Sequence, residues 1–218
     1  MEPTEHNRRA WDEVHRRRAE VLSGQLGLPP QVRHALADLH GKRVLNLQCG
    51  TGESAAELAE LGATVTAVDG SSEALGLARE RWPSILWIQS DVHALPRELR
   101  RGRFDLVYTG DGVLVWIHDL DAWSAGIASA LRSGADFLLC DGHPTAACVD
   151  GLMHWRESYF DEGTDADARF WRLGQIVTAI ARAGLVVRAL EEYPQQPGNF
   201  RHQDARVPGA FLLHAQRP

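Results

Sequence analysis

The chain has 218 residues and a formal net charge of −6 at pH 7, and 44% of its residues are hydrophobic. This length and composition are typical of one globular domain with a substantial core, and they exclude fibrous and disordered proteins. The negative charge argues against a general nucleic-acid-binding protein, and three cysteines are too few, and odd in number, for a disulfide framework.

The first twenty residues are too charged for a secretory signal peptide, and no apolar run reaches the roughly 18 residues of a membrane-spanning helix. We therefore expect a cytoplasmic protein with no membrane partner. Residues 1–40 indicate two helices, because Gly27 and Pro29–Pro30 interrupt the helical pattern. We predict that they form a helical cap segment and that residues 41–218 form one domain.

A buried strand, a glycine turn and a helix are predicted next. The apolar run at 44–47 is typical of a parallel strand. Gly50 and Gly52 let the backbone turn tightly and approach a ligand without a Cβ in the way. The helix at 53–61 ends at Gly62, and the unpaired N–H groups of its first turn favour an anionic ligand group.

The second strand ends at an acid. Asp69 follows Gly52 by 17 residues, close to the roughly 20 expected for the acid that accepts hydrogen bonds from ribose hydroxyls. We therefore expect the glycine turn and Asp69 to contact two ends of an adenosine-type cofactor.

Strands and helices continue to alternate after Asp69. The predicted elements are a helix capped by Ser71 or Ser72 and ending near Arg81, strands at 85–89 and 104–110, a helix from about Asp121 closed by Ser133–Gly134, a strand at 135–141, a helix at 169–183 ended by Gly184, and strands at 185–191 and 210–216. No helical pattern separates the last two strands, so we expect them to be antiparallel neighbours. The alternation predicts an α/β fold with a mostly parallel sheet.

A long connection at residues 143–168 falls outside this alternation. Long loops in compact domains are often lids over binding sites. Trp155, Tyr159 and Phe160 in this segment fit a substrate wall, and they also fit anchors that pin the loop to the core. We predict a substrate lid with Trp155 and Tyr159 as contacts, and the anchoring alternative stays open.

Residues 46–52 read N-L-Q-C-G-T-G, and Ser90-Asp91-Val92 follow the third predicted strand. With Asp69 and FDLVYTG at 104–110, these features make residues 40–218 resemble the class I S-adenosylmethionine-dependent methyltransferases, whose first loop has the pattern D-x-G-x-G-x-G. The loop is similar to that of a subgroup with an L-Q-C core. The resemblance implies a Rossmann-like, seven-stranded, mostly parallel sheet with helices on both faces and a C-terminal antiparallel hairpin.

The resemblance also implies S-adenosylmethionine as the cofactor and S-adenosylhomocysteine as its product. The expected cofactor contacts are Asn46, Gln48, Cys49, Gly50, Gly52, Asp69, Gly70, Ser71, Asp91, Val92 and Thr109. Cys49 need contribute only its backbone. Asp91 could instead cap the segment that follows it, and Gln48 could either bind the carboxylate of the cofactor or brace its own loop.

Methyl transfer requires the acceptor to be held close to the sulfonium carbon with water excluded, and a base helps when the acceptor is a hydroxyl or an ammonium. Asp111 and His143 are the candidate bases, because each follows a strand at the ligand-binding edge of the sheet. Either could instead serve a plain turn, and His118 and His154 are weaker candidates. Trp116 lies in a segment that resembles the one over the methyl end of the cofactor, so we expect it to contact the substrate.

Two alternatives remain. Residues 50–55 also satisfy G-x-G-x-x-A, which is a dinucleotide fingerprint, but a short-chain oxidoreductase would need a lysine four residues after a tyrosine, and Lys42 is the only lysine. A non-catalytic cofactor-binding relative is the other alternative, because Asn46 and Gln48 depart from the family pattern. The ten histidines show no spacing typical of a metal site.

We therefore predict an enzyme that methylates oxygen or nitrogen in a small molecule. No nucleic-acid module accompanies the domain, and the N/D-P-P-Y/F tetrapeptide of amino-methylating DNA enzymes is missing after the fourth strand. The acceptor, the methylated atom, the need for a base and the oligomeric state are left open by the sequence.

Overall fold

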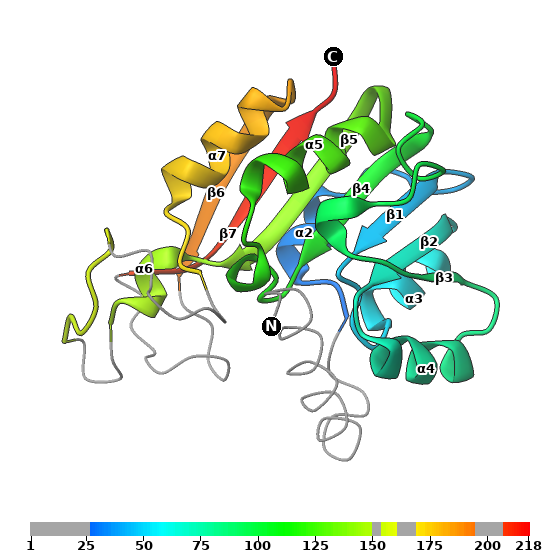
Figure 1. The fold of residues 1–218 in the computed structure, drawn as a ribbon, viewed down its shortest axis with the longest axis horizontal. Helices are drawn as coiled ribbons and strands as arrows, with labels where there is room; N and C mark the ends of the chain where they lie inside the picture. Colours follow the sequence, from blue (N-terminus) through cyan, green and yellow to red (C-terminus); the bar gives the residue numbers. More distant parts are fainter. Residues whose placement is uncertain (1–26, 150–153, 161–168, 195–206) are drawn as a thin grey trace.

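The computed structural model describes residues 27–149, 154–160, 169–194 and 207–218, and these residues form one seven-stranded sheet in the order β3-β2-β1-β4-β5-β7-β6 (Figure 1). The strands are β1 (Arg43–Leu47), β2 (Thr64–Asp69), β3 (Leu86–Gln89), β4 (Phe104–Gly110), β5 (Leu131–Gly142), β6 (Val186–Pro194) and β7 (Pro208–Gln216).

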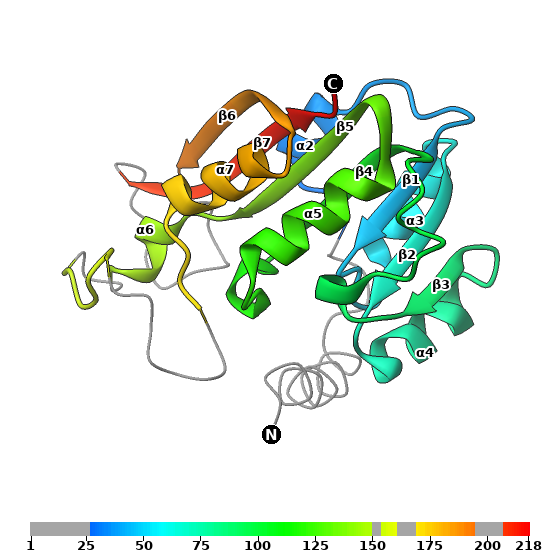
Figure 2. The same cartoon turned by 45° about the horizontal axis from the view of Figure 1, so that its top comes forward.

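Helices cover both faces of the sheet (Figures 1 and 2). The α-helices are α2 (Pro30–Ala35), α3 (Glu53–Glu60), α4 (Ser72–Arg81), α5 (Leu120–Ala130), α6 (Pro144–Ala147) and α7 (Leu173–Arg182), and two short 3₁₀ helices are η1 (Val92–Ala94) and η2 (Leu114–Trp116). One buried cluster joins the sheet to α5 and α7, and a second joins its other face to α2, α3 and α4. Successive strand residues alternate between them: Leu45 packs in the first cluster and Val44 in the second.

The predicted fold class is confirmed. Strands β1 to β5 pair in parallel, whereas β7 is antiparallel to both β5 and β6. The two last strands are therefore antiparallel neighbours, as the lack of a helical pattern between them indicated, and β7 lies inside the sheet while β6 forms its edge.

Two predicted boundaries are wrong. Helix α5 ends at Ala130, and Ser133–Gly134 lie inside the long strand β5 instead of closing the helix. Helix α7 begins at Leu173, four residues after the predicted start at Arg169. Residues 169–172 are held away from helical geometry by contacts with a distant loop: the Arg169 N–H donates to the Val115 carbonyl at 2.9 Å.

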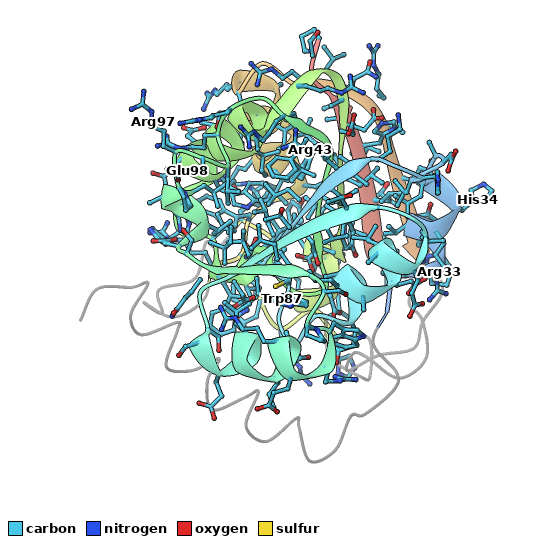
Figure 3. All side chains as sticks on the ribbon, turned by 90° about the vertical axis from the view of Figure 1, so that its right-hand side faces the viewer. Arg33, His34, Arg43, Trp87, Arg97 and Glu98 are labelled. Carbon is cyan, nitrogen blue, oxygen red and sulfur yellow. The ribbon has the colours of Figure 1, made fainter. Side chains whose placement is uncertain are left out.

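The described part of the N-terminal segment packs against α3. Glu57 accepts a hydrogen bond from the Leu28 N–H at 2.8 Å and forms an ion pair with the exposed Arg33 of α2 (Figure 3). The helix predicted before Gly27 lies outside the described residues. Within the described ranges, no helix has the length and apolar character needed to span a membrane.

Candidate active site

The candidate site lies at the carboxyl ends of the parallel strands, where the strand order reverses between β1 and β4. Strand β1 pairs with β2 on one side and with β4 on the other. The chain leaves β1 toward α3 on one face of the sheet and leaves β4 toward α5 on the opposite face. Open α/β sheets bind ligands in the crevice formed at such a point. The loops that border this crevice hold the predicted cofactor residues.

The glycine turn has a left-handed backbone at each position of the family pattern. The φ angles are 52° at Gln48, 54° at Gly50 and 95° at Gly52. Gly52 must also be small, because a Cβ there would lie 2.5 Å from Cη2 of Trp87, which packs between the turn and α4 (Figure 3). This tight packing places the N-terminus of α3 at the crevice.

Gln48 takes the left-handed conformation without being glycine, which costs about 1 to 2 kcal/mol. Its side-chain amide is bonded at both ends: Nε2 donates to the Val113 carbonyl at 3.2 Å, and Oε1 accepts from the Thr109 hydroxyl at 3.3 Å. Gln48 thus braces the glycine turn against the end of β4. These contacts favour the bracing role over a contact with the cofactor's carboxylate, and Thr109 takes part in the brace.

Asn46, in β1, and Cys49, in the turn that follows, are both buried. Asn46 is 2% exposed, and its Nδ2 donates to the Tyr108 carbonyl at 3.3 Å, while its Oδ1 has no partner among the described residues. Burial, and to a lesser extent the nearby Asp69, raises the pKa of the Cys49 thiol well above its ordinary value. The thiol therefore stays protonated, in keeping with a contact through its backbone only.

The Asp69 carboxylate links the glycine turn after β1 to the turn after β2. Its Oδ2 accepts from the Gly50 N–H at 2.8 Å, and its Oδ1 accepts from the Ser71 N–H at 2.8 Å. A carboxylate can accept up to four hydrogen bonds, so these two do not by themselves exhaust it. The carboxylate lies beside the glycine turn, as the predicted ribose contact requires.

The turn after β2 keeps an open face. A Cβ at Gly70 would meet no atom within 4 Å. The hydroxyl of Ser71 accepts from the Ala74 N–H at 3.1 Å and caps α4. Ser71 therefore has a structural role in addition to its predicted cofactor contact.

Asp91 begins a chain of contacts that reaches the loop after β4. Its Oδ1 accepts from the backbone N–H of His93 at 2.9 Å and lies 2.8 Å from His93 Nδ1, so Asp91 caps η1 at Val92. His93 Nε2 lies 3.3 Å from the backbone nitrogen of His118, and the two rings are in contact, with centroids 3.7 Å apart and planes tilted by 39°. The capping alternative for Asp91 is thus observed, and its contact with adenine remains a prediction.

Asp141, at the end of β5, organises the loop after β4 and was missed by sequence reasoning. It is 6% exposed and accepts from the N–H groups of Gly112 at 2.7 Å, Leu114 at 2.9 Å and Gly142 at 2.6 Å. Burial raises its pKa to about 6 although the three N–H groups act in the opposite direction. An acid at the end of an otherwise apolar strand was the signal that could have identified it.

The candidate base Asp111 lies in the loop that Asp141 holds. Asp111 is exposed, its backbone is left-handed with φ 71°, and its N–H donates to the Cys140 carbonyl at 3.1 Å. The role of Asp111 as a base remains a prediction.

The candidate base His143 is buried, with a hydrogen bond at Nδ1 and a carboxylate close to Nε2 that does not meet hydrogen-bond geometry. Nδ1 accepts from the Thr145 N–H at 3.1 Å, which caps α6, and Nε2 lies 2.9 Å from Glu192 Oε1 on β6. Burial lowers its pKa, and Glu192 partly offsets this shift. The contacts account for His143 as a structural residue at the end of β5.

A cavity of about 820 Å³ lies between the N-terminal end of α5 and the length of α7, and none of the predicted cofactor contacts lines it. Tyr159, predicted to contact substrate, lines it, and its hydroxyl accepts from the Leu173 N–H at 3.2 Å. Trp116 is half-buried in η2, whereas Trp155 is 62% exposed and pairs with Val149 through an isolated antiparallel bridge. The sequence did not identify His118 and Trp171 as part of the same cavity.

Comparisons with known proteins agree with this geometry. A family profile described as a methyltransferase domain matches residues 44–134. An uncharacterized methyltransferase of Synechocystis sp. is 36% identical over 113 residues, 50% of this chain and 50% of that protein. A malonyl-[acyl-carrier protein] O-methyltransferase of Enterobacter lignolyticus is 29% identical over 208 residues, 94% of this chain and 70% of that protein.

A solved structure of an S-adenosylmethionine-dependent methyltransferase from Mesorhizobium loti has a TM-score of 0.72 at 23% identity, covering 86% of this chain and 96% of that chain. The chain spans about half the length of the Synechocystis relative. Residues 44–134 thus match a methyltransferase-domain profile, and the described residues have the fold of the solved S-adenosylmethionine-dependent methyltransferase. Assignment to the L-Q-C subgroup remains a prediction.

Proposed function

We propose that this protein is a class I S-adenosylmethionine-dependent methyltransferase that acts on an oxygen or nitrogen atom of a small molecule. The observation that carries the proposal is the Asp69 carboxylate, which holds the glycine turn and the turn after β2 on either side of the crevice. The methyltransferase-domain match from β1 into β5 includes both turns.

The donors and acceptors at the crevice fit S-adenosylmethionine. Asp69 is an acceptor for hydroxyl donors such as those of a ribose, and the N-terminus of α3 behind Gly52 attracts a carboxylate. The open face of Gly70 leaves space beside Asp69. The cofactor supplies a methyl group already activated by a positive sulfur, and these residues bind and orient it.

The protein has three tasks in such a transfer: it fixes the donor, holds the acceptor in line with the methyl group, and excludes water. The bracing of Gln48 against Val113 links the donor turn to the loop after β4. Asp141 in turn fixes that loop through Gly112 and Leu114. The donor and acceptor sides of the crevice are therefore positioned by one connected set of hydrogen bonds.

Two observations support a small-molecule acceptor. The cavity of about 820 Å³ falls in the size range of small-molecule sites, and the relative with 94% coverage of this chain is named an O-methyltransferase. Its printed acceptor belongs to that protein, and we propose only the methylation of an oxygen or nitrogen atom here.

Titration calorimetry with S-adenosylmethionine, S-adenosylhomocysteine and NADH tests the cofactor. We expect the first two to bind and NADH to give no heat of binding. Asp69→Ala removes a charge-assisted contact and should weaken S-adenosylhomocysteine binding by about 1.5 to 3 kcal/mol. Asp38→Ala, an exposed acid near α2, is the matched control and should bind normally. Unchanged affinity in Asp69→Ala would mean that the nucleoside lies elsewhere.

A protein that binds the cofactor without turnover is a second candidate, favoured by the strained Gln48 and by the Oδ1 of Asn46, which has no partner in the described part of the chain. Product formation from a panel of phenols, amines and carboxylic acids separates the two. Methylated product identifies an enzyme, and tight binding of S-adenosylhomocysteine with no product from any acceptor favours the non-catalytic candidate.

A further inference from the structure

The cavity between α5 and α7 combines aromatic walls with one ionisable ring. Tyr159, Phe160 and Trp171 supply the aromatic groups, and His118 lies where the cavity meets the loop after β4. Trp171 is fixed by a 2.6 Å hydrogen bond from its Nε1 to the Ile117 carbonyl, next to His118. Flat aromatic walls favour a flat aromatic ligand through stacking.

His118 is oriented by its neighbours. Its Nδ1 is buried with no hydrogen-bond partner among the described residues, and the residue lines the cavity, which leaves Nε2 as the ring nitrogen to consider. The ring lies against that of His93 in a tilted arrangement. Because His93 is held by Asp91, the position of His118 depends on a chain of contacts that starts at the end of β3.

Burial, more than the charges that face it, favours the neutral form of His118. Burial lowers its pKa, and His93 and Arg169 act in the same direction, whereas Asp91 and Asp119 oppose them. A neutral imidazole at pH 7 can accept a proton. His143 is engaged by Thr145 and Glu192, and Asp111 is exposed to solvent, so neither has a comparable setting.

We infer that the methyl acceptor is a hydroxyl on a planar aromatic ring, that the ring binds in this cavity, and that His118 Nε2 accepts the hydroxyl proton. The inference rests on the proposed function and specifies its substrate class. In the transfer, the carbon–sulfur bond breaks and its electron pair stays on sulfur, which becomes a neutral thioether. A carbon–oxygen bond forms from an oxygen lone pair, and the proton of the O–H bond passes to Nε2 and later to water.

The chemistry of His118 selects a phenol among the usual acceptors. A carboxylic acid is already ionised at pH 7 and needs no base. An alkylammonium holds its proton more tightly than an imidazole of lowered pKa, so His118 would not remove it. A phenol is neutral at pH 7 and loses its proton as its oxygen attacks, so it is the acceptor that a neutral histidine assists.

Binding provides a test that does not require turnover. The probes are 2-naphthol, 2-naphthoate and 2-naphthylmethylamine, which share one ring system, titrated by calorimetry into the protein alone and with S-adenosylhomocysteine. We expect 2-naphthol to bind most tightly, and Thr178→Trp, at an exposed cavity-lining position on α7, to weaken it by about tenfold or more. Glu60→Trp, at an exposed position on α3, is the control and should leave binding intact.

Kinetics test the role of His118. With 2-naphthol at pH 7, His118→Gln should lower kcat by about 100-fold or more, with little change in the KM for S-adenosylmethionine. Its rate should recover as the pH approaches the pKa of 2-naphthol, because the ionised acceptor needs no base. His34→Gln, an exposed histidine on α2 (Figure 3), is the control and should retain the wild-type rate.

Each contrary outcome has a distinct meaning. If the wild-type protein does not bind S-adenosylhomocysteine, the proposed function is contradicted. If it binds S-adenosylhomocysteine but not 2-naphthol, only this inference is contradicted. The inference is also overturned by 2-naphthol binding that Thr178→Trp leaves intact, by binding without methyl transfer, or by a loss of kcat in His118→Gln that no increase in pH restores.

Discussion

The two sides of the crevice are built in different ways. On the cofactor side, backbone N–H groups of two turns donate to one carboxylate, as in the contacts of Asp69 with Gly50 and Ser71. On the acceptor side, bulky aromatic side chains bond to the backbone of other segments: Trp171 donates to the Ile117 carbonyl, and the Tyr159 hydroxyl accepts from the Leu173 N–H. The first side depends on backbone conformation and the second on tertiary packing, so substitutions on the two sides should have separable effects.

The largest effect should come from filling the space at the glycine turn. Gly52→Ala combines a left-handed backbone with a Cβ 2.5 Å from Trp87, so the free energy of unfolding should fall by about 3 to 4 kcal/mol in urea denaturation. Gly76→Ala in α4, where a Cβ meets nothing within 4 Å, is the control and should stabilise the protein slightly. Adding Trp87→Leu to Gly52→Ala should restore part of the loss. A Gly52→Ala protein of full stability would contradict this account of the turn.

The next effect concerns Asp141, whose carboxylate holds the loop after β4 on the acceptor side. Its folded-state pKa is raised to about 6, so the folded protein binds this proton more tightly than the unfolded chain does. The contribution of Asp141 to stability is therefore present below about pH 4 and decreases by as much as about 3 kcal/mol as the pH rises to about 6. Asp141→Asn removes this decrease.

The measurement is the difference in unfolding free energy between the wild type and Asp141→Asn at several pH values. The difference cancels the opposite trend of Asp105 and Glu57, whose pKa values are lowered. Between about pH 4 and pH 6, the unfolding free energy of the wild type should fall relative to that of Asp141→Asn. A pH-independent difference would mean that burial does not control this carboxyl.

A smaller effect tests whether the two sides are separable. Trp171→Phe removes the hydrogen bond to the buried Ile117 carbonyl and should lower the unfolding free energy by about 1 to 2 kcal/mol. The affinity for S-adenosylhomocysteine, measured by calorimetry, should stay the same because no cofactor-side contact involves Trp171. A marked loss of cofactor affinity would show that the two sides are coupled through this residue.

The smallest effect is expected at Gln48, where strain and bracing oppose each other. Gln48→Gly relieves the left-handed strain and loses both amide contacts, so its stability should lie within about 0.5 kcal/mol of the wild type. Gln48→Ala keeps the strain and loses the contacts, so it should be about 1 to 2 kcal/mol less stable. Equal thermal stability of the two variants would argue against a strained backbone at this position.

The sequence predicted the strands, the turn and the helix of the cofactor side well because their signals are local, and the cofactor contacts themselves stay predictions. The apolar run of β1, the glycines at 50 and 52, and Asp69 at the end of β2 lie within one strand–helix–strand unit, and all occupy the elements expected. The order of the later strands followed from the same alternation. The left-handed backbone at Gln48 could be anticipated only from the family pattern, since glutamine gives no such signal.

The acceptor side could not be predicted because tertiary contacts override its local patterns. The amphipathic period at 169–183 predicted a helix throughout, but the carbonyl of Val115 holds Arg169 in an extended segment before α7. The turn signal of Ser133–Gly134 predicted the end of α5, yet both residues lie in β5. The association of His118 with His93 and Trp171 depends on packing among three separate segments, which no motif records.

The position of β7 has a consequence for how the protein is made. Strand β6 is synthesised before β7, but its only neighbour in the sheet is β7, which lies between β6 and β5. While the chain grows on the ribosome, β6 therefore cannot dock, and its backbone groups remain without strand partners until β7 emerges from the exit tunnel. The parallel strands β1 to β5 can assemble during translation, whereas the antiparallel edge must assemble last. A nascent chain stalled before Pro208 should accordingly leave the outer side of β5 available to chaperones.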